Sequence, residues 1–322
     1  MGEEGKEDKV MADETDEIRT YPPGCAYVDG RFAPMAEAKI SVLDWGLLRS
    51  DATYDVVHVW KDRFFRLDEH INRFEESIRK LRMKLPFSRH KLEAILAECV
   101  RRAGHQDAYV EMILTRGVSP TFSRDPRDAV NNFIAFAIPF GSVANEEQQA
   151  RGLDLHVSNI PRISPASVDP TVKNYHWLDL IAGLFEAYDA GRENVLLEDG
   201  DGHITEGPGF NVFAVKRGHV TTPAGGVLEG ITRRTALELL AEMDVPADTG
   251  LLGVGNLHAA DEIFITSTAG GIMPVGQING DGVGETVPGA ITARLIELYW
   301  QKHADPAWSV AVEDLPIWSE PT

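Results

Sequence analysis

The chain has 322 residues, 43% of them hydrophobic, and a formal net charge of -19. This composition allows a large core in one big or two medium domains, and no apolar run reaches the roughly 20 residues that a membrane span needs. An acidic surface repels nucleic acid and anionic lipid, so we expect neither as a partner. The two cysteines, Cys25 and Cys99, have neither disulfide-framework nor zinc-ligand spacing, and no signal-peptide pattern is visible, so we predict a cytoplasmic protein without a metal site.

Changes in composition predict four segments along the chain. The first twenty residues carry eight acidic side chains and almost no apolar ones, which is typical of a disordered segment. The run SVANEEQQAR is polar and lacks strand or helix periodicity, so it is predicted to separate two domains. The predicted segments are a flexible acidic tail over residues 1–24, a small α/β domain over 25–140, an interdomain linker over 141–150 and a large domain over 151–322.

The small domain is predicted to combine strands and helices. Two hairpins turn at Asp29-Gly30, a favoured turn pair, and around Lys61-Asp62. Asp68 is expected to cap a helix whose apolar residues repeat at helical spacing. A second helix over 90–104 and strands over 108–117 and 132–140 complete a mixed α+β unit.

The large domain is also predicted to combine strands and helices. Its predicted elements are strands over 153–160 and 261–267, three strands within 194–223 with Asp-Gly and Arg-Gly turns, and helices over 176–191, from about 230, and over about 290–303.

Two glycine-containing turns in the large domain are candidate phosphate sites. Ile231 and Thr232 begin a predicted helix, and Thr268 follows a predicted strand. Free N–H groups at a helix N-terminus, together with nearby hydroxyl groups, bind phosphate well. Ordinary capping is the simpler interpretation of either turn alone, but both turns in one domain make a phosphate cradle a reasonable hypothesis.

Lys173 and Glu206 are the candidate reactive side chains. Lys173 lies in ASVDPTVKNYHWLDL, a largely apolar and aromatic stretch that disfavours its charge, and a desolvated lysine is a nucleophile for carbonyl groups. Glu206 lies in HITEGPGFNVFAV, where glycines let the backbone approach a ligand closely. Taken singly, an exposed lysine and a turn carboxylate are the simpler interpretations.

Four ordered motifs carry a resemblance to a known family. They are VDPTVKNYHWLDL, ITEGPGFNVFAV, GVLEGITRRT and TSTAGGIMPV. The set resembles the fold-type IV pyridoxal 5'-phosphate (PLP) enzymes, the class IV aminotransferases, over nearly all of residues 25–305. The resemblance implies a two-domain α+β or α/β fold like that of D-amino-acid aminotransferases, PLP bound by the large domain, and a homodimer. The wording D-P-x-V-K-N-x-x-W and the strand TYDVVHVW look closest to the (R)-selective amine transaminases.

The resemblance also implies roles for particular residues. Lys173 is expected to form the internal aldimine and to shuttle the proton, and Glu206 to bond the pyridine nitrogen, which keeps the ring electron-withdrawing. The phosphate contacts map onto Ile231, Thr232, Thr268 and Arg73, the arginine of an H-x-x-R pattern that begins at His70. Without the family, Arg73 is equally well a charge on a helix surface.

Three residues are expected to line the substrate pocket. Tyr54 and Val56 alternate on one face of a strand that lines the pocket in the family, and Trp177 ends the lysine motif. For Tyr54 and Val56, an ordinary place in the core is an equal alternative.

A carboxylate-binding arginine is harder to place. Phe122 stands where the family loop carries it, by ungapped alignment, and Arg124 lies two residues further on. Arg49 replaces a histidine that the family suggests. Arg49 and Arg124 are therefore the candidates for binding the carboxylate, with Arg49 slightly favoured and solvent-exposed charges as the alternative.

The predicted function is transfer of an amino group from a primary (R)-amine to a 2-keto acid such as pyruvate. The alternatives are a D-amino-acid or branched-chain amino-acid transaminase, a PLP lyase of the same fold, and a non-catalytic binding protein. The loop after Thr115-Arg116-Gly117 lacks an Arg-x-His pattern, which counts against a typical D-amino-acid enzyme, and the presence of both Lys173 and Glu206 counts against a non-catalytic protein.

Overall fold

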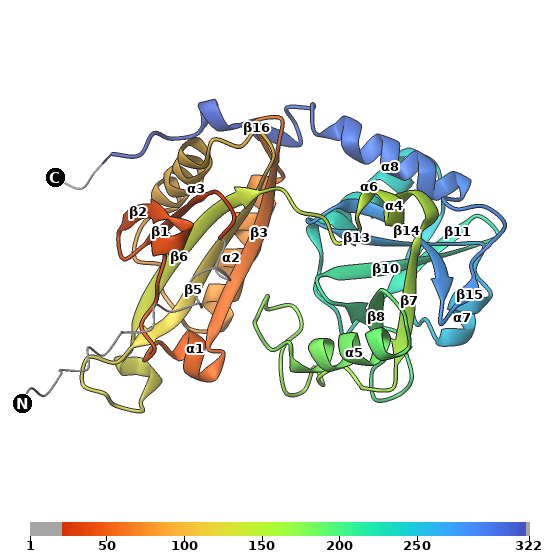
Figure 1. Ribbon diagram of the computed structural model, residues 1–322, viewed down its shortest axis with the longest axis horizontal. Coiled ribbons are helices and arrows are strands. Elements are labelled where there is room, and N and C mark those ends of the chain that lie inside the picture. Colours follow the sequence, from red (N-terminus) through yellow and green to blue (C-terminus); the bar gives the residue numbers. More distant parts are fainter. Residues whose placement is uncertain (1–20, 320–322) are drawn as a thin grey trace, which may run out of the picture.

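The computed structural model describes residues 21–319, so the predicted acidic tail lies almost entirely outside the described residues. Two mixed units stand side by side, each built on one large sheet (Figure 1). None of the described helices is long and apolar enough to cross a membrane.

The first unit is a seven-stranded antiparallel sheet in the order β16-β4-β3-β5-β6-β1-β2. Positive φ angles at Asp29 and Gly30, and at Lys61 and Asp62, confirm the two predicted hairpin turns. The elements are β1 (Cys25–Val28), β2 (Arg31–Pro34), α1 (Trp45–Arg49), β3 (Ala52–Trp60), β4 (Arg63–Phe65), α2 (Leu67–Lys80), α3 (Arg89–Ala103), β5 (Ala108–Val118), β6 (Val130–Pro139) and β16 (Ser309–Ala311).

Helix α2 begins one residue earlier than its predicted cap. Arg66 precedes it in the left-handed region, with φ of 55°, and makes no side-chain capping bond, so Asp68 lies inside the first turn. Ser88 caps α3, and Gly104 ends it with φ of 70°, a conformation that glycine adopts without strain.

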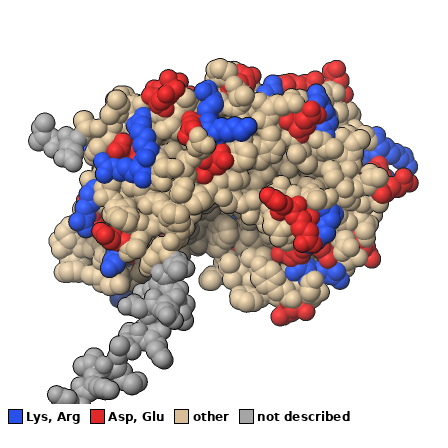
Figure 2. Space-filling model, turned by 45° about the horizontal axis from the view of Figure 1, so that its top comes forward, with Lys and Arg blue, Asp and Glu red and all other residues tan. Residues whose placement is uncertain are grey.

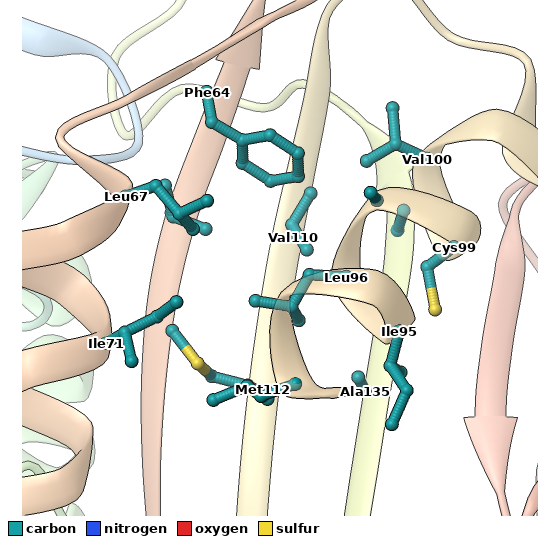
Figure 3. Packing of buried hydrophobic residues seen from close by; sticks show 14 of the residues in the cluster. Phe64, Leu67, Ile71, Ile95, Leu96, Cys99, Val100, Val110, Met112 and Ala135 are labelled. Carbon is teal, nitrogen blue, oxygen red and sulfur yellow. The ribbon is translucent and has the colours of Figure 1, made fainter. Parts of the chain in front are cut away.

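Helices α2 and α3 cover one face of this sheet and close the core of the first unit (Figure 3). Val57 and Val59 of β3 point into that core and are fully buried. Because side chains alternate along a strand, Tyr54, Val56 and His58 point from the opposite face toward the second unit. Alternate residues of β3 therefore belong to the core of the first unit and to the surface that faces the second unit.

The second unit is a nine-stranded mixed sheet with the main order β12-β11-β10-β13-β14-β7-β8, to which β15 and β9 are attached. Helices α6 and α8 cover one face around Phe213 and Phe264, and α5 packs on β7 and β8. The elements are α4 (Glu146–Arg151), β7 (Leu153–Ser158), α5 (Leu178–Asp189), β8 (Asn194–Leu197), β9 (Glu206–Gly207), β10 (Phe210–Lys216), β11 (His219–Pro223), α6 (Ile231–Glu242), β12 (Ala247–Gly250), α7 (Val254–His258), β13 (Glu262–Ser267), β14 (Gly271–Ile278), β15 (Asp281–Gly282) and α8 (Ala290–Lys302).

The structure changes the predicted segments in two places. The predicted linker over 141–150 contains most of α4, which Asn145 precedes as the cap of a complete capping box. The helix is too short to show a helical periodicity in the sequence. After α8 the chain returns to the first unit, where β16 pairs antiparallel with β4 and Val312 and Leu315 enter its core (Figure 1). The end of the predicted large domain therefore belongs to the first sheet, because strand pairing brings together segments that are distant in sequence.

Candidate active site

A pocket opens between the two units and collects the predicted reactive residues. Figure 2 shows a hollow between the two halves of the molecule, and the part of its wall that is in view is mostly uncharged. The pocket is lined by Tyr54 and Val56 of β3, by Lys173, by Glu206 of β9, and by the start of α6. Neither unit alone forms it, so the relative placement of the two sheets defines the site.

The segment that carries Lys173 is fastened to the first unit by its backbone. The Lys173 carbonyl accepts the Thr53 hydroxyl at 2.7 Å and the Tyr54 N–H at 3.2 Å, and Thr53 forms an antiparallel bridge with Asn174. The Lys173 N–H donates to the Ser77 hydroxyl at 3.4 Å. The lysine therefore comes from the chain between β7 and α5 but is held in place by β3 and α2.

The Lys173 amine sits in an environment that disfavours its charge. Its Nζ lies 4.4 Å from the centre of the Tyr54 ring. Desolvation, assisted by Arg73, lowers the pKa of Lys173 to about 8, although Asp55, Glu111 and Glu206 act in the opposite direction. The neutral amine, the form that attacks a carbonyl carbon, is therefore far more populated near neutral pH than in a lysine of ordinary pKa.

Glu206 is a buried carboxylate with fixed donors. Its two oxygens accept the Leu228 N–H at 2.9 Å and the guanidinium of Arg162 at 3.3 Å. Burial raises the pKa of Glu206, while Arg162 and the Leu228 N–H oppose this rise. Arg162 also donates to Asp179 at 2.6 Å, so two carboxylates share one guanidinium.

Arg162 is a functional residue that the sequence pattern does not reveal. It lies in an irregular loop after β7 without periodicity, and only its contacts with Glu206 and Asp179 make it visible. Its proline- and serine-rich surroundings give no signal for a buried cation.

The start of α6 and the turn after β13 form one concave wall of the pocket. Ile231, Thr232 and Thr268 all line it. A Cβ on Gly230, the residue before α6, would lie 2.2 Å from the side-chain oxygen of Asn211, so a larger residue would displace the Asn211 amide. The Thr266 hydroxyl, on a pocket-lining residue, is buried without a partner among the described residues.

These features fit a phosphorylated, aromatic cofactor. Helix α6 presents free N–H groups at its first turn, threonine hydroxyls lie nearby, and a carboxylate lines the same pocket as the lysine. The fit covers the three parts of PLP: phosphate, ring nitrogen and aldehyde.

Arg73 faces the same pocket from α2. Its Nε and Nη2 donate to Asp55 at 2.7 and 2.9 Å, and its Nη1 donates to the Glu229 carbonyl at 3.1 Å. His70 also bonds Asp55, at 2.7 Å. A guanidinium has five N–H groups, so two remain for a ligand.

The predicted substrate residues divide into two groups. Tyr54, Val56 and Trp177 line the pocket of Lys173. Phe122 is 75% exposed on a surface loop, and Arg124 is also exposed. Within this chain the structure brings neither loop residue to the pocket.

Arg49 also lies elsewhere. Its guanidinium carbon lies 3.5 Å from the ring centre of Trp45, and the residue lines a neighbouring cavity with Asp51 and His176. This cavity shares Val172 and Asn174 with the pocket of Lys173 but does not include Lys173. Ser50 ends α1 in the left-handed region with φ of 53°, so the chain changes direction between Arg49 and β3. Proximity in sequence to Tyr54 therefore does not place Arg49 in the same pocket.

A two-unit fold with a lysine, a buried carboxylate and a phosphate cradle in the pocket between the units defines a PLP-dependent enzyme. Residues 52–278 match the family model described as amino-transferase class IV, and the chain belongs to this family. The resemblance found in the sequence is therefore confirmed at the level of family, fold and cofactor, which is pyridoxal 5'-phosphate.

Several similar proteins are named branched-chain amino acid aminotransferases. A "putative branched-chain-amino-acid aminotransferase" of Methanocaldococcus jannaschii is 31% identical over 89% of this chain and 99% of that protein. The Escherichia coli branched-chain amino acid aminotransferase superposes with a TM-score of 0.85, at 25% identity over 90% of this chain and 99% of that chain. The Thermoproteus uzoniensis branched-chain aminotransferase with norvaline superposes with a TM-score of 0.82, at 27% identity over 90% of this chain and 99% of that chain. The (R)-selective amine subtype that the motif wording favours receives no support from these proteins.

Proposed function

We propose that this aminotransferase moves the amino group between branched-chain amino acids and 2-keto acids. The pocket carries this proposal, because apolar and aromatic side chains make up about half of the residues that line it; they include Val56, Val143, Val172, Leu180 and Phe210. Such a wall suits a branched aliphatic substituent. The names of the similar proteins support the same class of donor.

Each residue has a proposed role toward the cofactor. When bound, PLP carries the amino group between the two substrates and withdraws electrons from the reacting carbon. Lys173 holds the cofactor covalently and moves the proton at the substrate carbon with its amine. Glu206 faces the ring nitrogen and keeps it protonated. Arg73 and the wall of Ile231, Thr232 and Thr268 bind the phosphate.

A specific observation favours the (R)-amine transaminase as a second candidate. Arg73 and Arg162 are the guanidinium groups among the described residues that line the pocket, and each is paired with a carboxylate. A donor without a carboxylate needs no cation in the pocket, whereas a buried carboxylate without a cationic partner is costly. The keto acid carries a carboxylate in both candidates, so this observation bears on the donor alone.

A substrate panel separates the candidates. L-leucine and D-alanine, each with 2-oxoglutarate, are compared with both enantiomers of 1-phenylethylamine with pyruvate. The branched-chain proposal predicts turnover of L-leucine well above that of either amine. Preference for (R)-1-phenylethylamine selects the second candidate. Keto-acid release beyond one equivalent per active site without any acceptor selects a lyase, because a transaminase stops after one half-reaction.

The homodimer and the cytoplasmic location stay predictions from the sequence. Light scattering of the purified protein measures the first, and fractionation of the producing cells measures the second.

A further inference from the structure

Glu111 is a buried carboxylate beside the pocket for which no role has been assigned. It lies on β5 directly opposite Val56 of β3 and is 9% exposed. One oxygen accepts the Tyr175 hydroxyl at 2.7 Å, and the other accepts the Tyr109 hydroxyl at 3.1 Å. Both donors are neutral, so their hydrogen bonds hold the charge of Glu111 without cancelling it.

Tyr175 links Glu111 to the catalytic lysine. It follows Lys173 by two residues, and its ring stacks on Tyr54 with a centroid separation of 4.3 Å. The Lys173 amine lies 4.4 Å from the centre of the same Tyr54 ring. The Tyr175–Glu111 hydrogen bond therefore ties the segment of Lys173 to β5, in addition to the backbone bonds that tie it to β3.

Glu111 differs from the other carboxylates that act on Lys173. The charged groups around this amine come from α2, β3, β5 and β9: Arg73, Asp55, Glu111 and Glu206. Asp55 is paired with Arg73 and His70, and Glu206 is paired with Arg162. Of these three carboxylates, only Glu111 has no ion pair with a cationic side chain among the described residues. Its electrostatic effect on Lys173 is therefore the one least offset by a neighbouring positive charge.

We propose that Glu111, held by the hydroxyls of Tyr109 and Tyr175, is a positioning residue that fastens the lysine segment to the first sheet and keeps a negative charge beside the Lys173 amine. Burial raises the pKa of Glu111, and the two tyrosine hydroxyls oppose that rise. The same hydrogen bonds that place the segment therefore also help to keep the carboxylate ionised. The inference concerns the lysine and not the substrate, so it stands or falls separately from the proposed donor.

The test removes the charge and the fastening bond in separate variants. Glu111→Gln keeps the shape and loses the charge, and Tyr175→Phe keeps the stacked ring and loses the donor. Tyr188→Phe, at an exposed tyrosine of α5, is the matched control. Two titrations are followed: the visible absorption of the holoenzyme against pH, and the rate at which the Lys173 amine of the cofactor-free chain reacts with an alkylating reagent against pH.

A nearby negative charge stabilises a protonated nitrogen, so its loss lowers the pKa. Glu111→Gln should move both titrations of the Lys173 nitrogen to lower pH by roughly one unit, the usual scale for a nearby charge. Tyr175→Phe should move them in the same direction by less, and Tyr188→Phe should leave them in place. Titrations of Glu111→Gln that coincide with those of the wild type overturn the proposal, even if its melting temperature falls. If Glu111→Gln does not fold, an unshifted Tyr175→Phe overturns it.

Discussion

Lys173 and Tyr54 make two contacts, one through the backbone and one through the side chains. The Lys173 carbonyl accepts the Tyr54 N–H at 3.2 Å, and the Lys173 amine lies 4.4 Å from the centre of the Tyr54 ring. One residue of β3 thus fixes both the backbone and the side-chain end of the lysine. The geometry of the reactive amine depends on the first sheet, although the lysine is supplied by the chain that leads into α5.

Thr53→Val should cost about 1 kcal/mol of unfolding free energy and also lower kcat, because it removes one of the two hydrogen bonds to the Lys173 carbonyl. Chemical denaturation and steady-state kinetics measure the two effects. Thr222→Val is the control, since Thr222 is equally buried and also donates to a carbonyl, that of Val212 at 2.8 Å, but does not line the pocket. A loss of kcat in both variants would count against a specific effect on Lys173.

Glu206→Gln should retain the cofactor but slow turnover by roughly two or more orders of magnitude, as is usual when a preorganised electrostatic partner is lost. The reason is that an amide does not hold a proton on the ring nitrogen. Absorption spectroscopy reports cofactor content, and single-turnover kinetics report the rate. Wild-type turnover in this variant would remove Glu206 from the ring nitrogen.

Arg162→Leu should destabilise the protein by roughly 3–5 kcal/mol, because the buried Glu206 and the partly buried Asp179 would be left without their shared cation. Thermal and chemical unfolding measure the change. Arg127→Leu is the control: its ion pair with Asp125 is at the surface, where such pairs contribute at most about 1 kcal/mol. Equal effects in the two variants would contradict the buried role of Arg162.

The depressed pKa of Lys173 predicts a pH window in the stability of the cofactor-free chain. Its pKa is about 8 in the folded state against an ordinary 10.5, so the unfolded state binds more protons between these values. Stability from this group therefore rises with pH through that window. Relative to wild type, Lys173→Met should be more stable below pH 8, and the difference should shrink toward pH 10.5. A difference that stays constant with pH would show an undisturbed lysine.

Arg49→Ala should leave the KM for pyruvate unchanged, because Arg49 stacks on Trp45 and lines a different cavity from Lys173. Initial-rate kinetics with varied pyruvate provide the measurement, with Arg124→Ala for comparison. A raised KM in Arg49→Ala would mean that this side chain moves into the pocket when the keto acid binds.

Local patterns are sufficient to predict much of the fold and several residues that line the pocket. The hairpin turns at Asp29-Gly30 and Lys61-Asp62, and the helix start at Ile231, are set by residues that are neighbours in sequence. By contrast, Arg162 and Glu111 acquire their contacts only when distant segments meet. The same reason explains why the return of β16 to the first sheet could not be predicted.

Lys173 is the residue proposed to carry the cofactor. Purified holoenzyme is reduced with borohydride, digested and analysed by mass spectrometry, with Lys173→Ala treated in parallel. We expect the visible absorption band to disappear on reduction and a reduced cofactor adduct on the peptide that contains Lys173, with no adduct in Lys173→Ala. An adduct on another lysine of the wild-type protein would contradict the claim.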